Sequence, residues 1–175
     1  DFRVTTIAKG LDHPWSIAFL PDGGLLITER VGRLRLYQGG RLMPDPIAGV
    51  PGVVDSGQGG LLDVILHPNF TDNRFLYLSY AAHGIGGVHT KVTRFRFDEA
   101  AHDLTGPKQI FDAMPKARGG RHFGGRMAFD RAGYLFISVG ERGDMERAQR
   151  LTDHSGSIIR LKDDGGVPPD NPFVV

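Results

Sequence analysis

The sequence predicts an all-β protein that is built from one repeated unit. A pattern of strand, turn, strand, loop and alternating strand returns three times along the 175 residues, and no stretch shows sustained helical periodicity with caps. The 25 glycines and 11 prolines are typical of a chain with many turns and short strands. The units recur about every 45 to 60 residues, which is the spacing of β-propeller blades with long loops. We therefore expect one domain, residues 1–175, that is made of blade-like sheets.

The first unit begins with the apolar run Ile17-Ala18-Phe19-Leu20, whose length and flanks predict a short buried strand. Residues 21–24 (PDGG) predict a turn, and residues 25–28 predict the next strand. Residues 33–37 alternate charged and apolar side chains, which is typical of a half-exposed strand. Trp15 follows a His-Pro pair, and we expect it to pack in the core, with a cofactor wall as the alternative.

The other two units repeat this order of elements. In each of them the first turn is rich in Pro, Asp, Asn or Gly, as it is in the first unit. Between the units, residues 100–103 (AAHD) predict at most a turn. The expected strands are residues 61–66, 75–80 and 92–97 in the second unit, and 127–129, 134–139 and 158–161 in the third.

A glycine-rich loop precedes the first strand of the second unit and of the third unit. Residues 57–60 (GQGG) contain Gln58, and residues 119–125 (GGRHFGG) contain His122. Because equivalent loops of a propeller converge around its central axis, we expect these two side chains to face one shared pocket.

The same reasoning places His122 beside a carboxylate. His122 precedes the first strand of the third unit and Glu141 follows the second strand, so an antiparallel pairing brings the two together. A carboxylate beside an imidazole can fix the tautomer of the ring and raise its basicity, which suits a general base. On periodicity alone we favour the simpler interpretation, a loop histidine between turn glycines.

Basic residues surround His122 in the sequence. They attract a multiply anionic ligand, or they form solvated surface with one structural arginine, and the sequence leaves both interpretations open. The residues are Lys116, Arg118, Arg121 and Arg126.

The remaining polar groups predict no metal site. We expect His67 to be structural, because it lies in a His-Pro turn, and the spacing of His83 and His89 suits no standard zinc motif. Residues 163–166 (DDGG) lack the spacing and the terminal Glu of an EF-hand, so we expect a turn. The chain has no cysteine, which excludes disulfides and thiolate metal sites.

Charge and hydropathy argue against two classes of partner. The formal net charge of +1 gives no reason to expect nucleic-acid binding. No apolar run approaches the roughly 20 residues of a membrane-spanning helix. The chain starts at Asp1 without an initiator Met or a signal peptide, which fits a processed exported protein and equally an artificial boundary.

Four ordered motifs together resemble one known family. The chain is similar to the soluble pyrroloquinoline quinone (PQQ)-dependent aldose sugar dehydrogenases of the glucose/sorbosone dehydrogenase family. The resemblance implies a six-bladed β-propeller, of which this chain covers roughly the first three blades, and a periplasmic or secreted location. It also implies PQQ and Ca²⁺ as cofactors and oxidation of an aldose at its anomeric carbon to the lactone. The motifs are HPWSIAFLPDG (13–23), GQGGLLDVILHPNF (57–70), RHFGGRMAFDRAGYLFISVGERG (121–143) and VPPDNPF (167–173).

The resemblance also assigns roles to single residues. His122 matches the catalytic base of the family, and Glu141 matches the acidic residue that orients it. Gln58 matches a glutamine that reaches substrate and cofactor. We expect Arg121 and Arg126 to bind the cofactor, since a basic cluster suits a group with three carboxylates. The resemblance assigns no metal ligand and no electron acceptor to this chain.

Two residues depart from the pattern of the family. Arg121 stands where some members have Asp or Asn, and this position lies close to the substrate, so the choice of sugar is open. Ser157 stands where a lysine is usual.

Length and fold class leave further alternatives. The family continues for about as long again after the last motif, so we expect this chain either to be a piece of a longer protein or to pair with a second piece or copy that completes the ring. Because propellers carry unrelated functions, a propeller lactonase or other metal-dependent hydrolase and a non-catalytic interaction propeller stay open. A hydrolase of that class needs several acidic or amide metal ligands around the axis, where this sequence offers a histidine and a glutamine.

Overall fold

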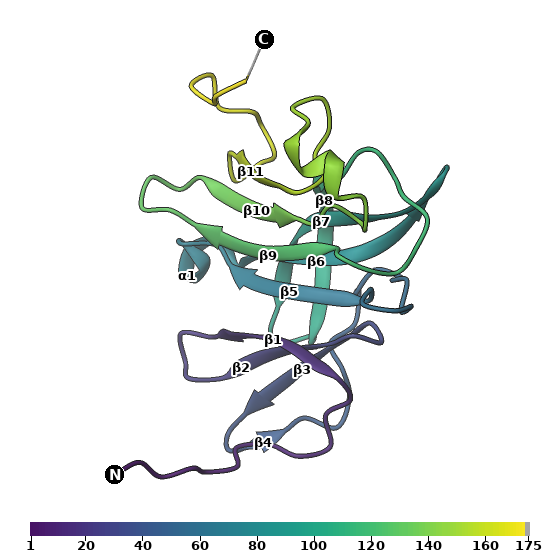
Figure 1. Cartoon of the computed structure of the whole chain (residues 1–175). Helices are drawn as coiled ribbons and strands as arrows, with labels where there is room; N and C mark the ends of the chain where they lie inside the picture. The colour runs from purple at the N-terminus through teal and green to yellow at the C-terminus, as the bar shows by residue number, and fades with distance from the viewer. Residues whose placement is uncertain (174–175) are drawn as a thin grey trace.

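The computed structural model describes residues 1–173 and shows a nearly all-β chain. Three antiparallel sheets follow one another along the chain and in space, with the N-terminus beside the first sheet and the C-terminus beside the third (Figure 1). The expected fold class, three consecutive blade-like sheets, is confirmed. Within the described part of the chain, no helix is long and apolar enough to cross a membrane.

Each sheet is formed by strands that are consecutive in the chain. The first contains β1 (Pro14–Phe19), β2 (Leu25–Glu29), β3 (Arg33–Gln38) and β4 (Arg41–Leu42). The second contains β5 (Leu61–Leu66), β6 (Phe75–Gly84), β7 (Gly87–Asp98) and β8 (Asp103–Asp112). The third contains β9 (Gly124–Phe129), β10 (Leu135–Val139) and β11 (Ser157–Leu161), and the two short helices are α1 (Phe70–Asn73) and η1 (Met145–Gln149).

Aspartate side chains shape the turns of the first and third sheets. In the turn between β1 and β2, Asp22 Oδ1 accepts a hydrogen bond from the Gly24 N–H at 2.9 Å. In the turn between β9 and β10, Asp130 Oδ1 accepts hydrogen bonds from the Ala132 and Tyr134 N–H groups at 2.9 Å each. The equivalent sequence positions therefore form equivalent turns, as the repeat predicts.

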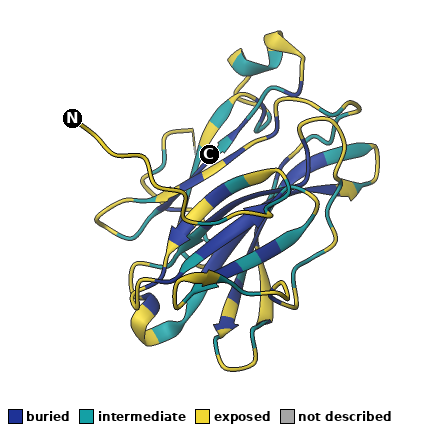
Figure 2. Ribbon diagram, turned by 90° about the horizontal axis from the view of Figure 1, so that it is seen from below, coloured by how far each residue is buried: buried dark blue, intermediate teal, exposed yellow. Residues whose placement is uncertain are grey.

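The sheets pack face to face around apolar layers, and their first strands β1, β5 and β9 are neighbours in the middle of the molecule (Figures 1 and 2). Leu26, Leu34 and Phe95 belong to the layer between the first two sheets. Tyr77 and Leu135 belong to the layer between the second and third sheets. The neighbouring first strands bring the loops that precede β5 and β9 to one end of the molecule.

The expectation of a fully buried first strand is wrong. Ile17 and Phe19 on β1 are 53% and 75% exposed, whereas the alternate residues Ser16 and Ala18 are buried. The strand alternates because only one face of the first sheet is covered by another sheet within residues 1–173. Ile158 on β11 is 66% exposed for the corresponding reason at the other end of the stack.

Four elements were absent from the sequence-based expectations, and the first of them is the two-residue strand β4. Strand β8 was missed because it contains Gly106 and Pro107, and these residues are tolerated since β8 is the edge of its sheet. The turn expected after β5 contains the single helical turn α1, which ends at Arg74 in the left-handed conformation (φ 58°). The short helix η1 has no buried residue and therefore no hydrophobic periodicity to detect.

Candidate functional site

His122 and Glu141 form a contact where the loop before β9 meets the loop after β10. The Nδ1 atom of His122 contacts Glu141 Oε1, which also accepts a hydrogen bond from the Gly143 N–H at 3.0 Å. The His122 hydrogen bond is the main cause that lowers the pKa of Glu141. The expected pairing is confirmed, and an ionised Glu141 favours the tautomer that carries its proton on Nδ1 and leaves Nε2 basic.

Gln58 joins this pair from the neighbouring sheet. Its side-chain Oε1 atom accepts a hydrogen bond from the backbone N–H of His122 at 2.8 Å. The backbone N–H of Gln58 donates to the Gly120 carbonyl at 2.6 Å. The two glycine-rich loops therefore lie against one another, whereas the expectation that the side chains of Gln58 and His122 face one shared pocket stays a prediction. Gly57 has a φ of 61°, and a Cβ atom at this position would overlap the Gly120 carbonyl, so only glycine permits this approach.

The backbone at His122 is itself unusual. His122 has a φ of 52°, in the left-handed region that a non-glycine residue rarely occupies. A Cβ atom at Gly140 would overlap the His122 carbonyl, so a glycine is needed directly before Glu141. The next residue, Phe123, is buried in a small apolar cluster with Leu62 and Ala81. The loop is thus anchored on one side of His122 by apolar packing.

Arg142 holds the other side of the same loop, and the sequence did not reveal it. Its guanidinium donates hydrogen bonds to the carbonyls of Arg121 at 2.9 Å, Gly119 at 2.7 Å and Val88 at 3.3 Å. Its Cζ atom lies 3.5 Å from the centroid of the Phe123 ring. Burial lowers the pKa of Arg142. The only signal in the sequence was its place directly after Glu141.

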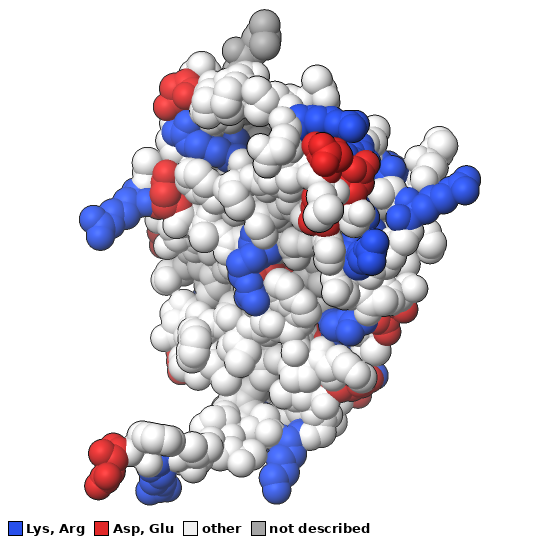
Figure 3. Space-filling model, viewed as in Figure 1, with Lys and Arg blue, Asp and Glu red and all other residues white. Residues whose placement is uncertain are grey.

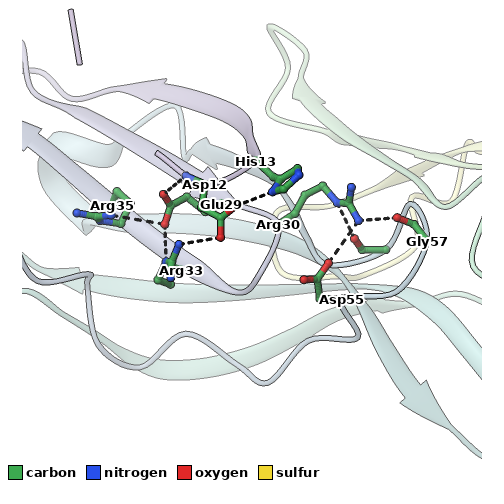
Figure 4. Close-up of polar contacts among 9 residues, drawn as sticks. Asp12, His13, Glu29, Arg30, Arg33, Arg35, Asp55 and Gly57 are labelled. Atoms are coloured by element: carbon green, nitrogen blue, oxygen red, sulfur yellow. Dashed lines mark hydrogen bonds and ion pairs between the residues drawn. The ribbon is translucent and has the colours of Figure 1, made fainter. Parts of the chain in front are cut away.

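Arg30 does the same for the loop that contains Gln58, and the sequence did not reveal it either. Figure 4 shows its guanidinium between Asp55 and the backbone of Gly57. Its Nε atom donates to the Gly59 carbonyl at 3.1 Å, and one Nη atom donates to the Gly57 carbonyl. Beside it, the fully buried Glu29 binds Arg33 at 2.6 Å (Figure 4).

The basic cluster around His122 divides into two groups. Lys116 lies 3.6 Å from Asp112, and Arg126 lies 3.1 Å from Asp63, so both have acidic partners. Arg118 and Arg121 instead line a cleft of about 740 Å³ that Glu141 also lines. Within residues 1–173, no carboxylate forms an ion pair with either of these two arginines.

The cleft is a local basic region and not part of a large basic face. Arg147 also lines it and pairs with Asp153 at 3.0 Å. In the view of Figure 3, basic and acidic side chains are interspersed over the molecule. Asp144, Glu141 and Arg142, which binds backbone carbonyls, also line the cleft. Arg118 and Arg121 form no ion pair within residues 1–173, so they suit a small anionic group.

Arg126 lies in a polar junction between the three sheets. Its Nη1 atom donates to Asp63 at 3.1 Å and to Ser16 Oγ at 3.2 Å, and its Cζ atom lies 4.2 Å from the centroid of the Trp15 ring. Trp15 packs against the apolar cluster of Leu62 and Phe123, as expected of a packing residue. The Arg126 side chain is 61% exposed, and its role in cofactor binding stays a prediction.

The other candidate ligands have structural surroundings. His67 accepts a hydrogen bond from the Asn69 N–H at 2.9 Å and contacts aromatic rings, which agrees with the structural role expected of it. Asp164 Oδ1 accepts a hydrogen bond from the Gly166 N–H at 2.9 Å and closes the expected turn. Among the residues described, no group of three or more His, Asp or Glu side chains is placed to hold a metal ion.

Comparison with known proteins shows the family of this chain. The model of the glucose/sorbosone dehydrogenase family matches residues 11–175. The chain belongs to this family. It is 46% identical over 174 residues to the aldose sugar dehydrogenase YliI of Escherichia coli K12, a match that covers 98% of this chain and 47% of that protein.

Solved structures of this family have the same fold. The apo form of the soluble aldose sugar dehydrogenase of Escherichia coli superposes with a TM-score of 0.93 at 45% identity, over 97% of this chain and 50% of that one. The PQQ-bound aldose sugar dehydrogenase of Streptomyces coelicolor superposes with a TM-score of 0.86 at 33% identity, over 97% and 50%. This glucose/sorbosone dehydrogenase chain thus spans about half the length of the relatives it matches.

Proposed function

We propose that this chain supplies the general base of a PQQ-dependent dehydrogenase that oxidises an aldose at its anomeric carbon to the lactone. The contact between His122 Nδ1 and Glu141 is the observation that carries this proposal. It provides an oriented imidazole beside a cleft, in a family with a PQQ-bound aldose sugar dehydrogenase among its structures.

The residues of the chain account for the proton transfer. Glu141 holds the Nδ1 proton, so Nε2 of His122 takes the proton of the anomeric hydroxyl. The hydrogen bond from the His122 N–H to Gln58 holds the left-handed backbone in place, and the contact with Glu141 directs the ring. Because Gln58 uses its Oε1 atom on the His122 N–H, its amide NH₂ is the group that can donate to a sugar oxygen.

PQQ, when bound, supplies the carbonyl carbon that accepts the hydride from the anomeric carbon. The cleft fits part of such a group, because Arg118 and Arg121 can bind carboxylates and have no acidic partner within residues 1–173. The described side chains do not form a calcium site, so Ca²⁺ rests on the resemblance alone.

Three further features belong to the same proposal. The substrate is a small aldose, and the remaining blades come from the rest of a longer protein or from a second piece or copy that completes the ring. The location is periplasmic or secreted. The sugar and the electron acceptor stay undefined.

One assay separates the proposal from its alternatives. Dye-coupled oxidation of aldoses is measured in the complete propeller, with and without added PQQ and Ca²⁺, and lactone hydrolysis is measured on the same samples. We expect oxidation that requires PQQ and no hydrolysis. Metal-dependent hydrolysis without PQQ would support a lactonase, and the absence of both activities would support an interaction propeller.

A further inference from the structure

Arg142 and Arg30 are used by no step of the proposed reaction, yet each is committed to backbone carbonyls of a glycine-rich loop. Arg142 donates to carbonyls at two positions of the loop that contains His122, Gly119 and Arg121. Arg30 donates to carbonyls on both sides of Gln58, those of Gly57 and Gly59. The two loops meet where Gln58 Oε1 accepts the His122 N–H.

The loop before β9 needs such support because it lies outside any strand. Residues 119–123 form no ladder, so their backbone groups require partners from elsewhere. The Gly120 carbonyl accepts a hydrogen bond from the backbone N–H of Gln58, and the Phe123 carbonyl accepts one from Thr90 Oγ1 at 2.7 Å. The carbonyls of Gly119 and Arg121, on either side of Gly120, accept hydrogen bonds from Arg142. Without Arg142, the segment directly before His122 loses two of its attachments.

The geometry of Arg142 requires an arginine. Three different nitrogens of the guanidinium reach three carbonyls, and one of these, Val88, belongs to the second sheet. The side chain is only 9% exposed, and its flat face covers the Phe123 ring. A lysine carries the same charge on one nitrogen, which cannot span the same three acceptors.

We propose that Arg142 is a positioning residue, which sets the His122 loop so that the imidazole meets Glu141 while the backbone N–H of His122 meets Gln58. Arg30 is its counterpart for the Gln58 loop. The inference rests on the proposed function for its catalytic consequence, whereas its effect on the loop is a property of the chain itself.

Hydrogen–deuterium exchange of this chain tests the effect on the loop without any activity. In Arg142→Lys and Arg142→Met, we expect the peptide that contains residues 119–123 to exchange at least about tenfold faster, while β6 and β10 keep their protection. Arg96→Met is the matched control, since Arg96 is an exposed arginine on β7. Unchanged exchange of residues 119–123 in a folded Arg142 variant would overturn the proposal.

Kinetics of the complete PQQ-loaded protein test the catalytic consequence. We expect Arg142→Lys to lower kcat by about 10- to 100-fold with a much smaller change in KM, because misplacing a base by about 1 Å can cost 10²-fold. The acid limb of the pH profile should move in the same direction as in Glu141→Gln. When Arg142→Lys and Glu141→Gln are combined, the second substitution should lower kcat little further, because both disturb the His122–Glu141 pair.

The outcomes separate the two proposals. If the wild-type protein oxidises no aldose with PQQ, the proposed function fails, and the exchange experiment still decides whether Arg142 holds the loop. If the wild type is active and Arg142→Lys keeps its kcat and its pH profile, then Arg142 only stabilises the fold. Additive losses in the double variant would equally overturn the positioning role.

Discussion

Asp63 connects the first strands of all three sheets through one buried carboxylate. Its side chain is 1% exposed, and its Oδ2 atom accepts a hydrogen bond from the Met127 N–H on β9 at 2.7 Å. Its Oδ1 atom accepts from Arg126 Nη1 at 3.1 Å and from Ser16 Oγ on β1. Because donors surround both oxygens, Asp63→Asn forces the new NH₂ group against an N–H or O–H donor whichever way the amide is turned.

The size of the effect follows from these contacts. Removing one partner of a buried ion pair costs about 3–5 kcal/mol. Here the Arg126 side chain is 61% exposed and can be solvated, so we expect a lower loss of about 2–4 kcal/mol in the free energy of unfolding. For a domain of this size, each kcal/mol lowers Tm by about 2–4 °C, which gives a decrease of about 4–16 °C.

Urea unfolding of this chain, followed by circular dichroism and checked by calorimetry, measures the loss directly. Ser16→Ala is the matched control, since it removes one donor and leaves the carboxylate in place, and it should cost about 0.5–1.5 kcal/mol. The reasoning is refuted if Asp63→Asn unfolds within about 0.5 kcal/mol of the wild type. It is also refuted if Ser16→Ala costs as much as Asp63→Asn, because the carboxylate would then not be the centre of the junction.

Three further predictions concern the site and the outer faces. His122→Ala in the complete protein should lower turnover by about 10²- to 10⁴-fold while PQQ titration changes little, and near-normal turnover would end the assignment of the base. The His122 hydrogen bond lowers the pKa of Glu141, so the carboxylate stays ionised below the pH at which a free glutamate is protonated. Glu141→Gln should therefore slow turnover and move the acid limb to lower pH, because the imidazolium loses the charge that stabilises it, and an unchanged profile would count against the pairing. Ile17, Phe19 and Ile158 expose apolar surface on the outer faces of the stack, so analytical ultracentrifugation should give a mass above the 19.1 kDa of one chain, whereas a stable monomer would contradict this.

The repeat made most of the fold predictable. Turn residues such as Asp22 and Asp130 stand at equivalent positions and use the same carboxylate hydrogen bonds, so local chemistry was sufficient to place the hairpins. The position of Gln58 relative to His122 followed from the same repeat and not from either residue alone. Burial was less predictable, because Ile17 and Phe19 have the side chains of core residues and lie on a face that no described sheet covers.

The residues that hold the site could not be predicted in this way. Arg142 and Arg30 bind carbonyl groups, and a carbonyl is present at every position of a chain, so the sequence contains no complementary residue to indicate their partners. Asp63 was hidden for a related reason, since two of its partners, Met127 N–H and Val64 N–H, are backbone groups. His122 was visible because its partner Glu141 has a charged side chain at a predictable strand end. Reactive side chains of a repeat protein can thus be found by pairing residue types, whereas the arginines that orient them become apparent only when the unpaired carbonyls of the loops are accounted for one by one.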